Sequence, residues 1–288
     1  MKYSALIQNR KSVREFSDKK VPAALLEEVQ HYYQNEVQRL VPDLKTQLHI
    51  LDSDAQIVLE GAAGYNQFLV GAPRYLVLQS EKGSLALENA GYIMEDLVLK
   101  LTELGLDSCW ITFADGQRVK DVLGLNPDME VAAIAAFGYG VKTTKRLRLN
   151  ILSMSNVDVS AQRRYFEPKR SIYDMVFWNT WGNRQGLDEA IGFYDDMLWE
   201  AFYAASQSPS YLNRQAYGFV VHDGGISLVR RPDVYTTEID GKLSLGIVLL
   251  HFTAVAAQWA GKIQWVFGEK ASKLELPEGH EVVASCKL

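Results

Sequence analysis

The sequence has few of the residues that mark metalloproteins and disulfide-stabilised proteins. Cys109 and Cys286 are the only cysteines among 288 residues, too few for a disulfide framework or a cysteine-rich metal site. The five histidines lie far apart, and none forms the i, i+4 pair that is typical of a metal-binding helix. We therefore expect a reduced protein without a metal centre.

A basic excess and a long apolar run are also missing. The formal net charge is -5, whereas proteins that bind nucleic acid usually carry a strong positive excess. No uninterrupted apolar run approaches the roughly 20 residues that cross a bilayer. The opening segment MKYSALIQNRKS lacks the apolar core of a secretory signal. The sequence thus predicts a cytoplasmic protein that binds neither nucleic acid nor membranes.

The common catalytic motifs are absent as well. Gly138-x-Gly140 lacks the third glycine of a dinucleotide fingerprint, and there is no Gly-Lys-Ser/Thr phosphate loop. Neither a nucleophile elbow nor a histidine partner for Cys109 is evident. What remains is the composition of a soluble globular chain, 48% hydrophobic and 23% charged. A chain with no obvious acid, base or nucleophile suits chemistry that a bound cofactor carries.

One short phrase occurs twice, as NRKSVREF at 9–16 and as PKRSIYDM at 168–175. In the first copy, Arg10, Ser12 and Arg14 stand at alternate positions. Alternate residues of an extended segment point to the same side, so these three donors could converge on one anion. The planar guanidinium group suits phosphate oxygens. In the second copy a tyrosine, Tyr173, replaces the second arginine.

A second basic pair, Arg146 and Arg148, follows the turn Gly138-Tyr139-Gly140 with the same spacing. For either group of arginines the alternative is a solvated surface face, which is where most arginines lie. The two groups together, each beside a turn, favour a shared anion site.

The expected elements repeat along the chain. Helices are predicted at 21–37, 90–106, 119–125, 188–208 and 242–261, and strands at 71–80, 108–113, 130–140, 216–222, 226–230 and 262–268. The helix and strand in 90–111 match those in 240–266, and RYLVLQ matches AYGFVVH. A basic arm and a polar stretch up to about residue 168 form the expected joint. The order predicts an internal duplication with halves at 1–155 and 165–288.

NRKSVREF resembles the opening Arg-x-Ser-x-Arg-x-Phe phrase of the nitroreductase-like FMN flavoproteins. SQSPSYLNRQAYGFVV, at 206–221, resembles their Pro-Ser-x-x-Asn-x-Gln signature, and GLDSCWITFAD, at 105–115, resembles a third region. The resemblance implies an α+β fold, an antiparallel sheet with flanking helices, built as a homodimer with FMN at the subunit interface. Here the arginine phrase and the Pro-Ser-x-x-Asn loop occur in different halves. The chain therefore resembles the single-chain, duplicated subgroup, in which one polypeptide mimics the dimer.

The resemblance also implies roles for single residues. Arg10 and Ser12 would contact the FMN phosphate and ribityl chain, with Lys11 beside them, and Arg14 would approach the N1/O2 edge of the ring. The remaining implied contacts are the late basic pair Arg146 and Arg148, the loop residues Pro209, Ser210 and Asn213, and the backbone of residues 112–114 with Phe113. Two departures from the family pattern are Lys11 and the pair Ala216-Tyr217, which stands where the family has Pro-Trp.

The sequence therefore predicts an FMN-dependent oxidoreductase that takes electrons from NAD(P)H and passes them to a nitroaromatic, quinone or flavin acceptor. The alternative is a non-catalytic flavin-binding or flavin-handling protein of the same fold. A third possibility is a structural protein whose arginines are surface charge. Because one good copy of each motif is present, we expect one FMN per chain and an active monomer.

Overall fold

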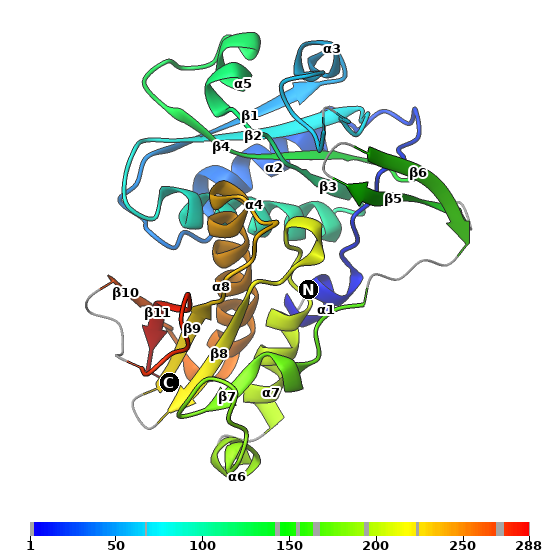
Figure 1. Cartoon of the computed structure of the whole chain (residues 1–288). Helices are drawn as coiled ribbons and strands as arrows, with labels where there is room; N and C mark the ends of the chain where they lie inside the picture. The colour runs from blue at the N-terminus through cyan, green and yellow to red at the C-terminus, as the bar shows by residue number, and fades with distance from the viewer. Residues whose placement is uncertain are drawn as a thin grey trace. The chain divides into compact units, whose positions relative to one another are not determined.

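The computed structural model describes residues 3–66, 68–141, 145–153, 156–163, 168–192, 196–222, 225–268 and 274–287 (Figure 1). It describes only the backbone of 145–153 and 156–163. The chain forms two compact units, one of Asn9–Glu167 and one of Lys2–Gln8 with Pro168–Leu288. The N-terminal helix α1 (Tyr3–Asn9) thus groups almost entirely with the second unit, whereas the arginine phrase that follows it belongs to the first.

The first unit is a four-stranded sheet in the order β1-β2-β4-β3, with antiparallel pairing throughout. Its central strand β4 is buried at every position except the first, which explains its almost continuous run of alanine, valine and isoleucine. The elements are α2 (Ala23–Asn35), β1 (Thr46–Asp52), α3 (Ala55–Leu59), β2 (Arg74–Ser80), α4 (Ala86–Glu103), β3 (Asp107–Ile111), α5 (Gly116–Leu123) and β4 (Glu130–Gly138).

Helix α4 is the main core helix of this unit and contacts β2, β3 and β4. Ile93, Leu97 and Leu101 recur with helical period and are fully buried. The helix stops where Gly105 adopts a φ of +74°, which glycine reaches without strain. The amide of Leu106 then donates to the carbonyl of Leu101 at 2.8 Å, so the chain turns directly into β3.

The second unit contains a five-stranded sheet in the order β10-β11-β9-β8-β7, in which β7 and β8 are parallel and the other pairs antiparallel. Phe202, Phe219 and Phe252 pack together in its core with ring centroids 5.3 to 5.4 Å apart. The elements are η1 (Ile172–Asp174), β7 (Val176–Trp178), α6 (Leu187–Gly192), α7 (Asp196–Ser206), η2 (Tyr211–Asn213), β8 (Tyr217–His222), β9 (Gly225–Arg230), α8 (Glu238–Ala260), β10 (Val266–Phe267) and β11 (Glu281–Cys286).

The two units share one topology. The order β1-β2-β4-β3 recurs as β8-β9-β11-β10, and a long helix, α4 or α8, follows the second strand of each set along the chain. Strand β8 therefore takes the place of β1, so the sequence match of RYLVLQ (β2) with AYGFVVH (β8) paired the wrong strands. The match of 90–111 with 240–266 agrees with the topology, because it pairs α4 and β3 with α8 and β10.

The predicted joint contains regular structure. β5 (Lys145–Ser153) and β6 (Asn156–Arg163) pair antiparallel as a separate two-stranded sheet. Leucine and isoleucine alternate with polar residues in KRLRLNILS, which is the period of a strand and could have predicted β5. Two elements, α6 and α7, lie in the region 188–208 that was predicted as one helix.

Among the described helices, α8 alone is long and apolar enough to cross a membrane. Of its most apolar 18-residue window, 78% is buried inside the protein. The core helix of a soluble protein passes the same test of length and composition, and burial accounts for the apolar residues of α8.

Candidate functional site

The arginine phrase is held in the first unit as an extended segment beside the sheet. The amide of Val13 donates to the carbonyl of Ser108 in β3 at 2.8 Å, and Ser12 forms a parallel bridge with the same residue. Further along, Ser17 donates to the carbonyl of Tyr139 at 2.8 Å and Val141 donates to that of Glu15 at 3.0 Å. Residues 12–17 are thus fixed at both ends by backbone hydrogen bonds.

The glycines of the Gly138-Tyr139-Gly140 turn allow this close approach. A Cβ at Gly138 would lie 2.4 Å from Pro73 Cγ. A Cβ at Gly140 would lie 2.7 Å from Asp107 Oδ2 and 2.9 Å from Val13 Cγ1. The amide of Gly140 donates to that aspartate oxygen at 2.9 Å. Both glycines therefore serve the packing of the turn against its neighbours, Asp107 and Val13 among them.

Arg10 forms a buried ion pair with Glu95. Its Nε lies 3.6 Å from Oε1 of Glu95 in α4, with the two side chains only 7% and 0% exposed. The other oxygen of Glu95 accepts a hydrogen bond from Trp110 Nε1 at 2.8 Å. Arg10 Nε itself has no hydrogen-bond partner among the described residues, and Nη1 donates to Ser12 Oγ over 3.5 Å. The guanidinium group is therefore anchored by charge, and its far nitrogens lie beside Ser12.

Arg14 carries a charge that no acidic side chain of the described residues balances in an ion pair. It is half-buried, and with Arg10 it lies close enough to Cys109 to act on the thiol electrostatically. Burial raises the pKa of Cys109, and the two arginines lower it by less. A half-buried cation without a counter-ion favours the binding of an anion at this position.

The other predicted contacts of the first unit differ in their placement. Lys11 is exposed and Phe113 is buried, 4% exposed. The carbonyl of Thr112 accepts a hydrogen bond from Gly64 at 2.7 Å. Arg146 and Arg148 lie on β5, but their side chains are outside the described residues. The roles of all these residues remain predictions.

In the second unit the Pro-Ser-x-x-Asn-x-Gln loop is hydrogen-bonded to the start of the second copy of the phrase, at residues 168–170. Asn213 accepts from Lys169 Nζ at 2.8 Å and donates to the carbonyl of Pro168 at 2.9 Å. Gln215 accepts from the amide of Arg170 at 2.8 Å. The residue that replaced Arg10 in the second copy, Lys169, is thus bound to the loop, and it also donates to the carbonyl of Ser208 at 2.9 Å.

The loop has a strained backbone. Leu212, Asn213 and Gln215 all have positive φ, at 48°, 55° and 45°, in a region that residues with a side chain rarely adopt. Ser210 Oγ accepts from the amide of Gln215 at 2.9 Å, and Gln215 donates to the carbonyl of Ser206 at 2.6 Å. These bonds hold the conformation, and such held strain clusters at functional sites.

We expect Asn213→Ala to destabilise the second unit by about 2 to 4 kcal/mol, because it removes two hydrogen bonds and adds left-handed strain. Asn213→Gly is the matched control, since it loses the same bonds without the strain and should be about 1 kcal/mol less damaging. Urea unfolding measures both. A glycine variant as stable as the parent would contradict this account of the loop.

Several residues that shape these sites belong to no recognisable sequence motif. Glu95 and Trp110 occupy ordinary positions in a core helix and a strand, and Asp107 opens that strand. An acid inside the apolar period of α4 is the one signal that could have indicated a buried pair. Lys169, the counterpart of Arg10, gave no indication that it would bind the loop.

Three solved structures illustrate what the chain is similar to. A "putative nitroreductase" of Thermotoga maritima has a TM-score of 0.58 and 20% identity, with 94% of this chain and 91% of that chain covered. A nitroreductase family protein of Clostridium novyi NT covers 49% of this chain and 87% of its own, with 17% identity and a TM-score of 0.44. An FMN-dependent nitroreductase of Clostridium difficile R20291 covers 49% and 89%, with 21% identity and a TM-score of 0.43.

No curated protein matches the chain in sequence. The first of these structures confirms the predicted nitroreductase-like α+β fold. The family model described as "Putative TM nitroreductase" matches residues 3–256, which is most of the chain. The protein therefore belongs to this nitroreductase family, a family of oxidoreductases.

Proposed function

We propose that the protein is an FMN-dependent oxidoreductase that takes electrons from NAD(P)H and passes them to a small nitroaromatic, quinone or flavin acceptor. The observation that carries the proposal is the fixed arginine phrase. Backbone bonds hold residues 12–17 beside β3 and the glycine turn, and Arg14 remains without an acidic partner among the described side chains. The strained loop at 209–215 supports it, because it carries the second family signature.

The donor set of the first unit fits the phosphate of FMN. Arg14 and Lys11 are cations with no ion pair to any described residue, and Ser12 adds a hydroxyl donor. Arg10 Nη1 lies 3.5 Å from Ser12 Oγ, and Glu95 lies on the Nε side of the same guanidinium group. Charge-assisted bonds of this kind are the strong ones in phosphate recognition.

The second copy of the phrase differs at the positions of Arg10 and Arg14, where it has Lys169 and Tyr173. Lys169 is bound to Asn213 and to the carbonyl of Ser208, and Tyr173 stacks under Arg184 with 4.3 Å between the guanidinium carbon and the ring centre. At the position of Arg14, therefore, only the first copy keeps a cation that forms no ion pair with a described residue. We expect one FMN per chain on this basis.

Bound FMN would supply the hydride and electron chemistry that the side chains lack. The protein's own groups would position it: Arg10 and Ser12, with Lys11 beside them, at the phosphate and ribityl chain, and Arg14 at the N1/O2 edge of the ring. A cation at Arg14 would also favour an anionic ring edge over a neutral one.

The first experiment measures flavin in the purified chain, from absorbance after denaturation and against protein concentration. We expect one FMN per chain, and two would contradict the specialised-copy proposal. Steady-state oxidation of NADH and NADPH with a nitroaromatic and a quinone acceptor then tests turnover. Flavin without turnover would indicate the non-catalytic alternative, and a colourless protein that binds no added FMN would refute both.

A further inference from the structure

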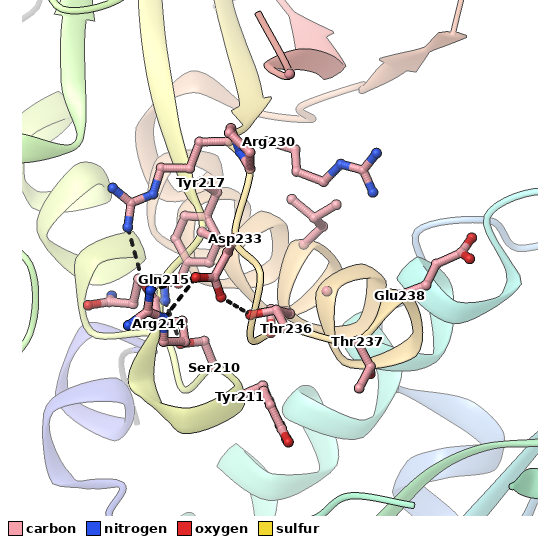
Figure 2. Close-up of a pocket in the computed structure, with 17 residues that line it drawn as sticks. Ser210, Tyr211, Arg214, Gln215, Tyr217, Arg230, Asp233, Thr236, Thr237 and Glu238 are labelled. Atoms are coloured by element: carbon pink, nitrogen blue, oxygen red, sulfur yellow. Dashed lines mark hydrogen bonds and ion pairs between the residues drawn. The ribbon is translucent and has the colours of Figure 1, made fainter. Parts of the chain in front are cut away.

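The second unit contains a cavity that includes one predicted flavin contact, Ser210, but is lined mostly by other residues. It has an open volume of about 670 Å³, including space open to solvent. The loop at 210–217, the segment 230–238 between β9 and α8, and the first turns of α8 line it (Figure 2). Three of its lining side chains are arginines, namely Arg214, Arg230 and Arg231.

Two of these arginines are paired with acids. Arg214 Nη2 and Nε donate to Asp233 Oδ1 at 2.6 and 2.9 Å, and Thr236 donates to the other oxygen of the same carboxylate (Figure 2). Burial alone would raise the pKa of Asp233, but the bonds from Arg214 and Thr236 outweigh it and lower that pKa. Arg230 pairs with Glu281 at 2.7 Å.

Arg231 is the exception. Its Nη2 donates only to the backbone carbonyl of Arg214, at 3.2 Å. Its buried Nε has no hydrogen-bond partner among the described residues. Burial first, and then the nearby charge of Arg170, lower the pKa of Arg231 to about 10. Burial also lowers the pKa of Arg170. Both groups remain cationic at neutral pH. Asp233 acts electrostatically on both, and Asp174 acts on Arg170 as well, but neither arginine forms an ion pair with an acid of the described residues.

The start of α8 adds a weaker contribution. The first N–H groups of a helix have no acceptor within it and favour anions. Glu238 and Asp240 in the same turn oppose this, although Glu238 pairs with Lys242 at 2.8 Å and Asp240 accepts from the Thr237 hydroxyl at 2.7 Å. The arginines, and not the helix, therefore make the site.

The corresponding turn of the first unit, between β2 and α4, has a different lining. Residues 81–85 contain no arginine. A Cβ at Gly83 in this turn would lie 2.8 Å from Cδ2 of the half-buried Leu44. The arginines of the cavity are therefore a feature of the second unit alone.

We propose that this cavity is a second anion site, which binds the phosphate or carboxylate group of a small molecule through Arg231, with Arg214 beside it. Arg231 lines the cavity with a planar guanidinium charge that no acid of the described residues pairs, and Arg214 can share its guanidinium group between Asp233 and a bound oxyanion. The proposal does not depend on flavin binding, because its ligand and its residues are separate from the arginine phrase.

Isothermal titration of the full chain, as purified, tests the proposal with inorganic phosphate and with benzoate at constant ionic strength. We expect saturable binding of at least one probe, and the stronger one identifies the oxyanion class. Arg231→Gln should weaken it about ten- to a hundredfold, the effect of one charge-assisted bond. Arg184→Gln should leave it unchanged.

Asp233→Asn gives a test of opposite sign, because it removes the acid that competes for Arg214 and should tighten binding severalfold. This variant also decides the matter if Arg231→Gln does not fold. Binding that is lost in Arg14→Gln but kept in Arg231→Gln would place the anion at the arginine phrase and overturn the proposal. So would no saturable binding of either probe, equal weakening in Arg231→Gln and Arg184→Gln, or weaker or unchanged binding in Asp233→Asn.

Discussion

Replacing Arg14 with alanine is expected to lower the affinity of the protein for FMN by about ten- to a hundredfold, because a charge-assisted contact to an anionic group contributes on the order of 1.5 to 3 kcal/mol. Arg14 is the half-buried cation of the phrase that forms no ion pair with any described residue. Its loss should therefore remove ligand affinity without breaking an interaction that stabilises the first unit. Fluorescence titration of the flavin-free chain with FMN measures the effect.

The matched control is Tyr173→Ala, at the same position of the second copy. Tyr173 is 65% exposed and stacks with Arg184 outside any buried site. We expect its replacement to leave FMN affinity and stoichiometry unchanged. Equal losses in the two variants would contradict the view that only the first copy holds the cofactor, and a loss of folded protein in Arg14→Ala would be visible by circular dichroism.

Much of the fold could be predicted from hydrophobic period. The apolar spacing of Ile93, Leu97 and Leu101 predicted α4, and the structure ends that helix just before Gly105, as expected. The short strands β7 and β10 were harder, because three and two residues give almost no period, and β10 covers only Val266–Phe267 of the strand predicted at 262–268. Strand β11 was not predicted, although it spans six residues. Their formation depends on neighbouring strands, which a local pattern does not contain.

The strand correspondence between the halves illustrates the same limit. RYLVLQ and AYGFVVH are alike because both are buried strands, not because they occupy one place in the sheet. Sheet order, which depends on long-range pairing, assigns β8 to the place of β1. Composition identifies a buried strand, and only its partners identify its position.

The sequence identified the arginines of the candidate site but not their environments, for a related reason. Arg10 and Arg14 stand in a recognisable phrase, and from the sequence both are predicted to bind an anion. The structure gives them different environments, since Arg10 is buried on Glu95 and Arg14 is not paired with an acid. That difference depends on a residue about 80 positions away in α4, so no local spacing could have indicated it. Similarly, nothing near Lys169 predicted its bond to Asn213.

The Glu95–Arg10 pair leads to the largest expected effect on stability. Glu95 is 0% exposed and accepts from Trp110 with one oxygen while the other faces Arg10. Glu95→Gln keeps an oxygen for Trp110 but leaves the buried guanidinium charge without its counter-ion. Breaking one side of a buried ion pair costs about 3 to 5 kcal/mol, and we expect the free energy of unfolding in urea to fall by that amount.

Glu103→Gln on the same helix is the control, because Glu103 pairs with Lys100 at 3.1 Å near the surface and such pairs contribute about 0 to 1 kcal/mol. The double variant Arg10→Met/Glu95→Gln removes both charges and should recover much of the stability that Glu95→Gln loses, since no buried charge is then left alone. Additive losses in the double variant, or a loss in Glu95→Gln no larger than in Glu103→Gln, would show that the pair does not anchor Arg10. Recovery of stability without recovery of FMN affinity would instead separate the two functions of Arg10, because methionine restores the packing of the first unit but cannot bind a phosphate.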